Sequence, residues 1–147
     1  MNLTIQCAKV IQPAPSADII RWLSLAVQTG AKNSSIAKQA TITVRFVGSK
    51  ESQWLNKQYR HKNYATNVLT FPYSVSPLHA DLVLCTPVLR KESKEQGKLM
   101  VDHLAHLLIH GALHALGHDH ETEADAHQME ALEIGLLKRL AIANPYG

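Results

Sequence analysis

The chain has 147 residues, about the size of one domain, and 46% of them are hydrophobic, which is enough apolar surface for a core. No run of 18 apolar residues is present and the first residues lack the features of a secretory signal, so we expect neither a membrane span nor export. The formal net charge of +3 permits an anionic partner without requiring one. We therefore expect a single cytoplasmic domain over residues 1–147.

Hydrophobic periodicity in the first sixty residues predicts two strands, each followed by a helix. The alternation of Ile42, Val44 and Phe46 with polar residues is the clearest strand signal, because every second side chain of a strand points to the same face. Ser16 and Ser49 are favourable N-cap residues for the two helices. The expected elements are a strand over 3–7, a helix from Ser16 to Gly30, a polar loop over 32–39, a strand over 40–47 and a helix from Ser49 that carries Trp54, Leu55 and Tyr59.

After an irregular stretch over 60–67, the pattern predicts two more strands and three more helices. Pro72 is expected to end the third strand, Gly97 and Gly117 to end helices, and Thr122 with Asp125 to begin the last helix. The expected elements are strands over 68–71 and 81–85, helices over 87–95 and 101–115, and a final helix with the apolar stripe Met129, Leu132, Leu136 and Leu140. The predicted class is α+β: a small, mostly four-stranded sheet with about five helices.

The two cysteines, Cys7 and Cys85, lie far apart and have no metal-binding or redox spacing. We expect two buried, reduced thiols, as in a cytosolic protein.

Histidines are the unusual feature of the composition: the chain has nine, and six fall between His103 and His120. His110 and His114 are four residues apart, so they lie on one face of the predicted helix and can reach one ion. Gly117 lets the backbone turn, and His120 can then supply a third ligand. Three histidines leave the fourth tetrahedral position open, which is typical of a catalytic zinc site. The sequence thus predicts a metal site at the end of a central helix.

The spacing equals that of the long zinc-protease motif, but one residue differs. That motif has a glutamate directly after its first histidine, where it acts as general base. Here Gly111 occupies that position. The metal ligands are therefore present and the peptidase base is missing.

Other polar residues near the motif allow more than one role. His118 competes with His120 as a ligand, although a turn at Gly117 favours His120. His103, His106 and Asp119 are candidates to orient ligands or substrate, or are simply buried, hydrogen-bonded groups and a turn cap. The remaining histidines, His61, His79 and His127, are expected at the surface.

Over most of its length the chain resembles the YbeY family of bacterial metallo-endoribonucleases. The matching residues are His110, Gly111, Leu113, His114, Gly117, Asp119 and His120, with Leu55, Asn56, Tyr59, Arg60, residues 66–72, Asp81, Leu82, Val83, His103, His106, Pro145 and Tyr146. The resemblance implies a single-strand-specific endoribonuclease of ribosomal RNA maturation and ribosome quality control, one zinc ion on His110, His114 and His120, and a functional Arg60. Its expected partners are single-stranded RNA, ribosomal RNA or the ribosome, and neither DNA nor a membrane.

Three positions depart from the family pattern. The family usually has aspartate where Asn67 stands, glycine where Ala80 stands and tyrosine where His118 stands. Asn67, a candidate substrate contact, keeps hydrogen-bonding ability and loses a charge. None of the three belongs to the predicted metal ligands.

The expected chemistry is hydrolysis by a zinc-activated hydroxide, with Arg60 and His114 as the catalytic residues. The hydroxide could attack phosphorus or act as base toward a ribose 2′-hydroxyl, and a guanidinium could clamp the phosphoryl oxygens. Two alternatives stay open. One is a zinc hydrolase of another substrate class, with His118 or Glu121 as base. The other is a ribosome-associated protein whose structural zinc is closed by His118 or Asp119.

Overall fold

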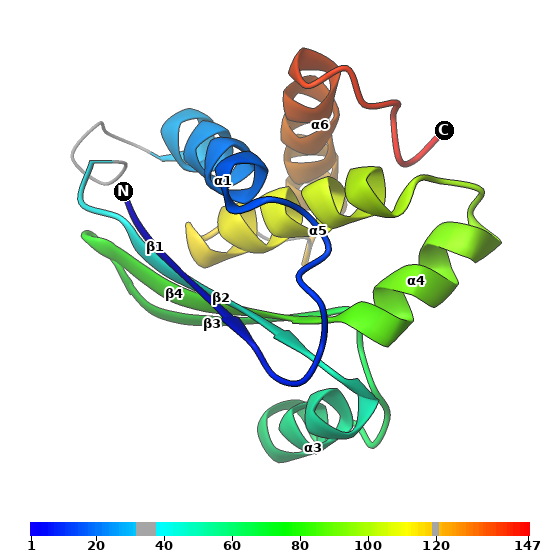
Figure 1. Ribbon diagram of the computed structural model, residues 1–147. Helices are drawn as coiled ribbons and strands as arrows, with labels where there is room; N and C mark the ends of the chain where they lie inside the picture. Colours follow the sequence, from blue (N-terminus) through cyan, green and yellow to red (C-terminus); the bar gives the residue numbers. More distant parts are fainter. Residues whose placement is uncertain (32–37, 119–120) are drawn as a thin grey trace.

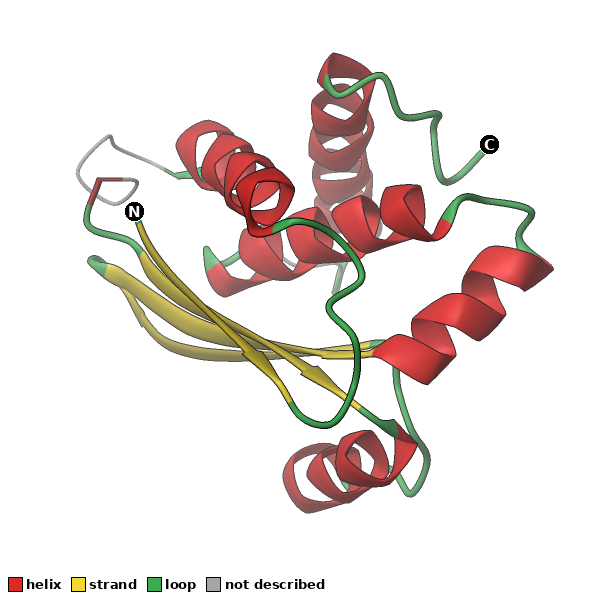
Figure 2. Ribbon diagram, in the orientation of Figure 1, coloured by secondary structure: helices red, strands yellow, loops and turns green. Residues whose placement is uncertain are grey.

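A four-stranded mixed sheet forms the centre of the computed structural model, which describes residues 1–31, 38–118 and 121–147. The strands are β1 (Asn2–Cys7), β2 (Thr41–Val47), β3 (Val68–Val75) and β4 (Leu78–Cys85), in the spatial order β1-β2-β4-β3. β2 is parallel to both of its neighbours, β1 and β4, whereas the edge strand β3 runs antiparallel to β4. Figure 2 shows the twisted sheet with helices above it and one helix below it.

Five helices surround the sheet in the described part of the chain: α1 (Ser16–Gly30), α3 (Ser49–Arg60), α4 (Thr86–Glu95), α5 (Met100–Ala115) and α6 (Glu123–Arg139). In Figure 1, α1, α5 and α6 lie on one side of the sheet and α3 lies on the other. None of these helices is both long and apolar enough to cross a membrane. The predicted α+β class with four strands and about five helices is confirmed.

The main core lies between the sheet and the helices above it. The predicted inner face of β2 is confirmed, because Ile42, Val44 and Phe46 are at most 1% exposed. They belong to one buried cluster with residues of β4, α1, α5 and α6, among them Leu82, Leu84, Ile19, Leu23, Leu104, Leu108, Leu113, Met129 and Leu136. A smaller buried cluster of Val47, Leu69, Val83 and Cys85 forms a second apolar centre. Helix α5 is therefore anchored in the core along its length.

Several local predictions were wrong in detail. Ser16 and Ser49 are the first residues of α1 and α3, and the N-caps are Pro15 and Gly48. Pro72 does not end β3, because β3 is an edge strand in which a missing N–H costs little; a register shift follows between Pro72 and Ser74. Cys7 is exposed rather than buried, while Cys85 is buried and both thiols are free as expected.

Other boundaries follow the predicted signals. Thr122 caps α6, and its hydroxyl accepts a hydrogen bond from the backbone N–H of Asp125 over 3.1 Å. Gly97 and Gly117 have φ values of +63° and +99°, which glycine adopts without strain, and each follows a helix. The loop predicted over 32–39 lies mostly outside the described residues.

Candidate functional site

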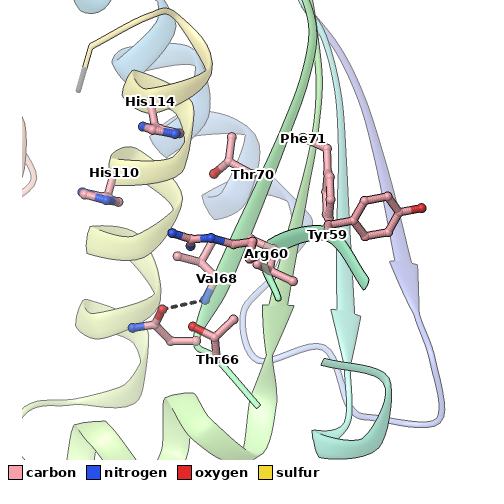
Figure 3. Close-up of a pocket in the computed structure, with 10 residues that line it drawn as sticks. Tyr59, Arg60, Thr66, Val68, Thr70, Phe71, His110 and His114 are labelled. Atoms are coloured by element: carbon pink, nitrogen blue, oxygen red, sulfur yellow. Dashed lines mark hydrogen bonds between the residues drawn. The ribbon is translucent and has the colours of Figure 1, made fainter. Parts of the chain in front are cut away.

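A cavity of about 520 Å³ lies between α5 and the edge strand β3. Figure 3 shows His110 and His114 one turn apart on α5, with Arg60 extending toward them from the β3 side. The lining residues come from α3, β3, the loop before β3, and α5: Tyr59, Arg60, Thr66, Asn67, Val68, Leu69, Thr70, Phe71, His110 and His114. The cavity thus brings together the two predicted helical ligands and the predicted arginine, which are far apart in the sequence.

Helix α5 carries the two histidines because its sequence has two different faces. Leu104, Leu108 and Leu113 are fully buried in the core, and truncating such a side chain to alanine typically costs about 2–5 kcal/mol. His114 is exposed and His110 is intermediate. The helix ends at Ala115 and Gly117 turns the chain, as predicted. The core therefore fixes the helix, and the helix presents both imidazoles to the cavity.

Gly111 allows α5 to approach the sheet closely. A Cβ atom at this position would lie 3.1 Å from Cδ2 of Leu82 and 3.4 Å from Oγ1 of Thr70. Such a contact is tighter than ordinary packing, so a large side chain does not fit without moving its neighbours. The structure thus gives a reason for the missing peptidase base: the position that would hold the glutamate faces the sheet.

Arg60 is the last residue of α3, and the end of that helix is well defined. His61 adopts a left-handed conformation with φ of 59°, and its N–H donates to the carbonyl of Lys57 over 3.1 Å. The buried Asn56 donates to the carbonyl of Tyr64 over 2.8 Å. The exposed Arg60 makes no hydrogen bond or ion pair with any other residue that the structure describes. Its guanidinium can therefore bind an anion in the cavity.

The buried carboxylate of Glu133 on α6 stands behind His110. Its Oε1 lies 2.5 Å from Nδ1 of His110 and 3.8 Å from Nε2 of His106, and its Oε2 accepts a hydrogen bond from the hydroxyl of Tyr146. Burial favours the neutral acid, but the contacts with His106, His110 and Tyr146 outweigh it and lower the pKa of Glu133 to about 2. Burial and the same carboxylate raise the pKa of Tyr146. Glu133 is therefore a charged group that is 0% exposed.

Asn67 and His103 share a second carboxylate, that of Glu92 on α4. The amide Nδ2 of Asn67 lies 3.1 and 3.3 Å from the two oxygens of Glu92, and Nε2 of His103 lies 2.9 Å from Oε1. Oδ1 of Asn67 accepts from the N–H of Val68 over 2.6 Å. An aspartate at position 67 would face Glu92 with a like charge. The asparagine therefore suits this partner, and it fixes the start of β3 beside the cavity.

The remaining predicted residues lie elsewhere. Nε2 of His118 lies 2.9 Å from the carbonyl oxygen of Gly30, so its N–H at Nε2 donates to the backbone and that nitrogen is not a ligand. His61, His79 and His127 are exposed, as expected. Asp119 and His120 lie outside the described residues, so the third ligand stays a prediction.

The donor set of the cavity fits a divalent ion of the zinc type. His110 and His114 offer imidazole nitrogens from adjacent turns, and a carboxylate behind a ligating histidine is the usual arrangement in such sites. Within residues 1–31, 38–118 and 121–147, no group of three histidine, cysteine or acidic side chains is gathered as a metal site. The fit therefore rests on two described donors and the predicted His120.

Comparison with known proteins identifies the family of the chain. The profile of the family described as Endoribonuclease YbeY matches residues 5–141, which is nearly the whole chain. The chain belongs to this family. The Endoribonuclease YbeY of Albidiferax ferrireducens is 49% identical over 153 residues, which cover 99% of this chain and 97% of the relative. The Endoribonuclease YbeY of a Polaromonas species is 54% identical over 134 residues, which cover 90% and 81%.

A solved structure supports the fold alone. The solution structure of a Thermotoga maritima protein superimposes with a TM-score of 0.58 at 19% sequence identity, and the match covers 95% of this chain and 91% of that one. At this identity the likeness shows a common architecture. The expected sheet and helices therefore form an architecture that this solved protein shares.

Sequence reasoning missed two residues next to the site of this YbeY protein, Glu133 and Glu92. Glu133 occupies a position of the buried stripe of α6, between Met129 and Leu136. An ionisable residue inside an apolar stripe usually needs a partner, and this pattern could have identified Glu133 from the sequence. Glu92 gave no such signal, because an acidic residue on a charged helix is usually solvated.

Proposed function

We propose that this protein is a zinc-dependent endoribonuclease that cleaves single-stranded RNA. The observation that carries the proposal is the single cavity that contains both Arg60 and the pair His110 and His114. A metal site next to a guanidinium suits phosphodiester hydrolysis, because the reaction builds charge on phosphoryl oxygens. The names of the YbeY relatives agree with this activity.

His110, His114 and His120 would hold the ion. A bound zinc ion supplies Lewis-acid chemistry and activates water at neutral pH. Arg60 acts on the substrate: its planar fork binds two phosphoryl oxygens and orients the scissile phosphate within the cavity. Thr70 and Asn67 border the same space and offer polar contacts to the ribose-phosphate backbone.

Single strands suit the cavity better than duplexes. The cavity lies between a helix and a strand edge, where a flexible backbone can bend inward and a stiff duplex cannot. Tyr59 is 63% exposed and lies edge-on to Phe71, with 5.1 Å between the ring centroids. An exposed aromatic ring beside a phosphate-binding arginine can stack on an unpaired base.

We further propose that the physiological substrate is ribosomal RNA or the ribosome and that the protein acts in the cytoplasm. The resemblance of the motifs supports the substrate class. Two free thiols, one of them exposed, suit a reducing compartment. Ribosomal RNA ends mapped in cells whose only copy carries His114→Ala should be extended, and unchanged ends would contradict the ribosomal role.

The direct test uses an end-labelled, unstructured RNA, the same sequence as DNA, and the RNA annealed to its complement. We expect zinc-loaded protein to cut the single-stranded RNA alone, and a chelator to stop cleavage until zinc is restored. His114→Ala should be inactive. His127→Ala, which changes an exposed histidine of α6, is the matched control and should cut normally. Equal cleavage by His114→Ala, or cleavage that survives the chelator, would overturn the proposal.

The alternative of a zinc hydrolase of another substrate class needs its base from outside position 111. Gly111 faces Leu82 and Thr70, Nε2 of His118 donates to the backbone of Gly30, and Glu121 stays a candidate base. The same contact of His118 counts against that nitrogen as a fourth, closing ligand of a structural zinc.

A further inference from the structure

His110 can offer only one of its ring nitrogens to the cavity. Its Nδ1 lies 2.5 Å from Oε1 of Glu133, on the side of α5 that packs against α6. A carboxylate accepts hydrogen bonds and cannot donate them, so this contact requires a proton on Nδ1. In the neutral ring, Nε2 then carries the lone pair.

Glu133 is itself held in place from a second direction. Its Oε2 accepts the hydroxyl proton of Tyr146, from the segment that follows α6. The hydroxyl of Tyr146 donates its hydrogen bond to Glu133, so its oxygen accepts one from Nε2 of His106, which lies 3.3 Å away. This contact assigns the ring proton of His106 to Nε2. Both oxygens of the carboxylate are thus engaged, and the carboxylate has little freedom to rotate.

The segment that carries Tyr146 is tied to the rest of the fold. The N–H of Tyr146 donates to Oδ1 of Asn144 over 2.8 Å, and Nζ of Lys98 lies 3.4 Å from the carbonyl oxygen of Pro145. The ring of Tyr146 also lies edge-on to His106, with 5.5 Å between the centroids. These contacts place the hydroxyl, so the chain of hydrogen bonds runs from the C-terminal segment to the cavity.

Burying the carboxylate of Glu133 costs free energy, and this cost indicates that the residue has a role. A carboxylate that is 0% exposed loses its hydration, and an apolar residue would be the usual choice at a position in the stripe of α6. A carboxylate behind a ligating imidazole selects the tautomer, fixes the plane of the ring and increases the basicity of the other nitrogen.

We propose that Glu133, fixed by Tyr146, is a positioning residue that sets the tautomer and ring orientation of His110 for zinc binding. The inference rests on the proposed function, because it needs His110 to be a zinc ligand. Glu133 acts through His110 and contacts neither the substrate nor the ion.

The first measurement is the zinc dissociation constant, obtained by competition with a chromogenic chelator. Glu133→Gln keeps the shape and removes the charge, and it should weaken zinc binding about 10–100-fold. Tyr146→Phe removes only a hydroxyl from a half-exposed side chain and should cause a smaller loss, of about several-fold. The matched controls are Glu95→Gln and Tyr64→Phe, which change exposed groups away from the cavity and should bind zinc normally.

The second measurement separates positioning from general stability. In the zinc-free protein, nitrogen-15 spectra of the imidazole rings should show His110 with its proton on Nδ1, and Glu133→Gln should shift it toward a mixture of tautomers. Thermal unfolding of each variant without zinc reports whether it folds. If Glu133→Gln does not fold, Tyr146→Phe still provides both readouts.

The outcomes distinguish the inference from the proposed function. Wild-type protein that binds zinc, with unchanged dissociation constants in folded Glu133→Gln and Tyr146→Phe, would overturn the role of Glu133 and leave the metal site intact. A proton found on Nε2 of His110 in the wild type would overturn it as well. Wild-type protein that binds no zinc would instead overturn the proposed metal site.

Discussion

The two walls of the cavity are built in different ways. On the α5 wall, His110 is backed by the buried Glu133, and the helix beneath it is fixed by core leucines. On the opposite wall, Arg60 ends an amphipathic helix on the other side of the sheet, and its exposed side chain has no polar partner in the described part of the chain. The α5 wall is fixed by the core and by Glu133, whereas the guanidinium of Arg60 on the opposite wall has no polar partner among the described residues.

The difference in rigidity is explained by the ligand that we propose for each wall. A metal ion requires ligand distances within a few tenths of an ångström, so its histidines gain from rigid support. An RNA backbone is flexible, and a long arginine side chain can adjust to it while keeping its charge. The proposed ion would thus be held on a rigid wall, and the proposed RNA substrate would meet an adjustable side chain.

Replacing Arg60 should show most clearly that the two walls contribute separately to RNA cleavage and to zinc binding. Arg60→Ala should lower the rate of RNA cleavage by about 10²–10³-fold, as expected for a lost donor to developing charge, and leave the zinc dissociation constant unchanged. Arg60→Lys should recover only part of the rate, because an ammonium cannot form the two-pronged contact. Single-turnover kinetics and chelator competition measure the two quantities. A parallel loss of zinc binding would show that the walls are coupled.

Replacing Gly111 tests how tightly α5 packs against the sheet. Gly111→Val should lower the free energy of unfolding by about 1–3 kcal/mol, because its side chain meets Leu82 across a 3.1 Å gap. Urea denaturation measures the change. The matched control is Gly135→Val on α6, where an added Cβ meets nothing within 4 Å, and it should be neutral or slightly stabilising. Equal effects at the two positions would mean that helix propensity, not packing, decides the outcome.

The smallest expected effect concerns Tyr73 on the edge strand β3, other residues of which line the cavity. Its hydroxyl donates to Oδ2 of Asp81 over 2.8 Å, and this hydrogen bond, with burial and the charge of Asp81, raises the pKa of Tyr73. A raised pKa in the folded state means that the pair stabilises the fold below the ordinary tyrosine pKa of about 10 and loses that contribution as the pH rises through the higher value.

Asp81→Asn should therefore bring the titration of Tyr73 back toward its ordinary range, as followed by the ring resonances in NMR spectra. Stability near neutral pH should change little, since the pair is exposed. An unchanged titration of Tyr73 would contradict the contact.

Much of the fold was readable in the sequence because the strongest signals are local. The alternation in β2, the helix ends at Gly97 and Gly117, and the capping of α6 by Thr122 all depend on nearby residues. Errors arose where tertiary context decides: Pro72 is tolerated inside β3 because the strand is at the edge of the sheet. The prediction that Cys7 is buried failed because β1 is the other edge strand.

The site was predictable in unequal parts for the same reason. The spacing of His110, His114 and Gly117 is a local pattern that geometry alone can interpret. Arg60 looks like a surface arginine in isolation, and only the family resemblance singled it out. Glu133 lies 23 residues after His110, so nothing in the local sequence connects them. Side chains brought together by helix packing leave almost no local trace.

The close approach at Gly111 has a consequence for protein engineering. By sequence alone, converting this scaffold into a zinc peptidase needs one substitution, Gly111→Glu, because the spacing of the predicted metal ligands already matches. The Cβ atom of the new side chain would lie 3.1 Å from Cδ2 of Leu82, so the glutamate would start against the sheet. A designer would have to shorten the side chain at position 82 and then restore the lost packing elsewhere. The two chemistries differ by one residue in the motif, but they are separated by a rebuilt helix–sheet interface.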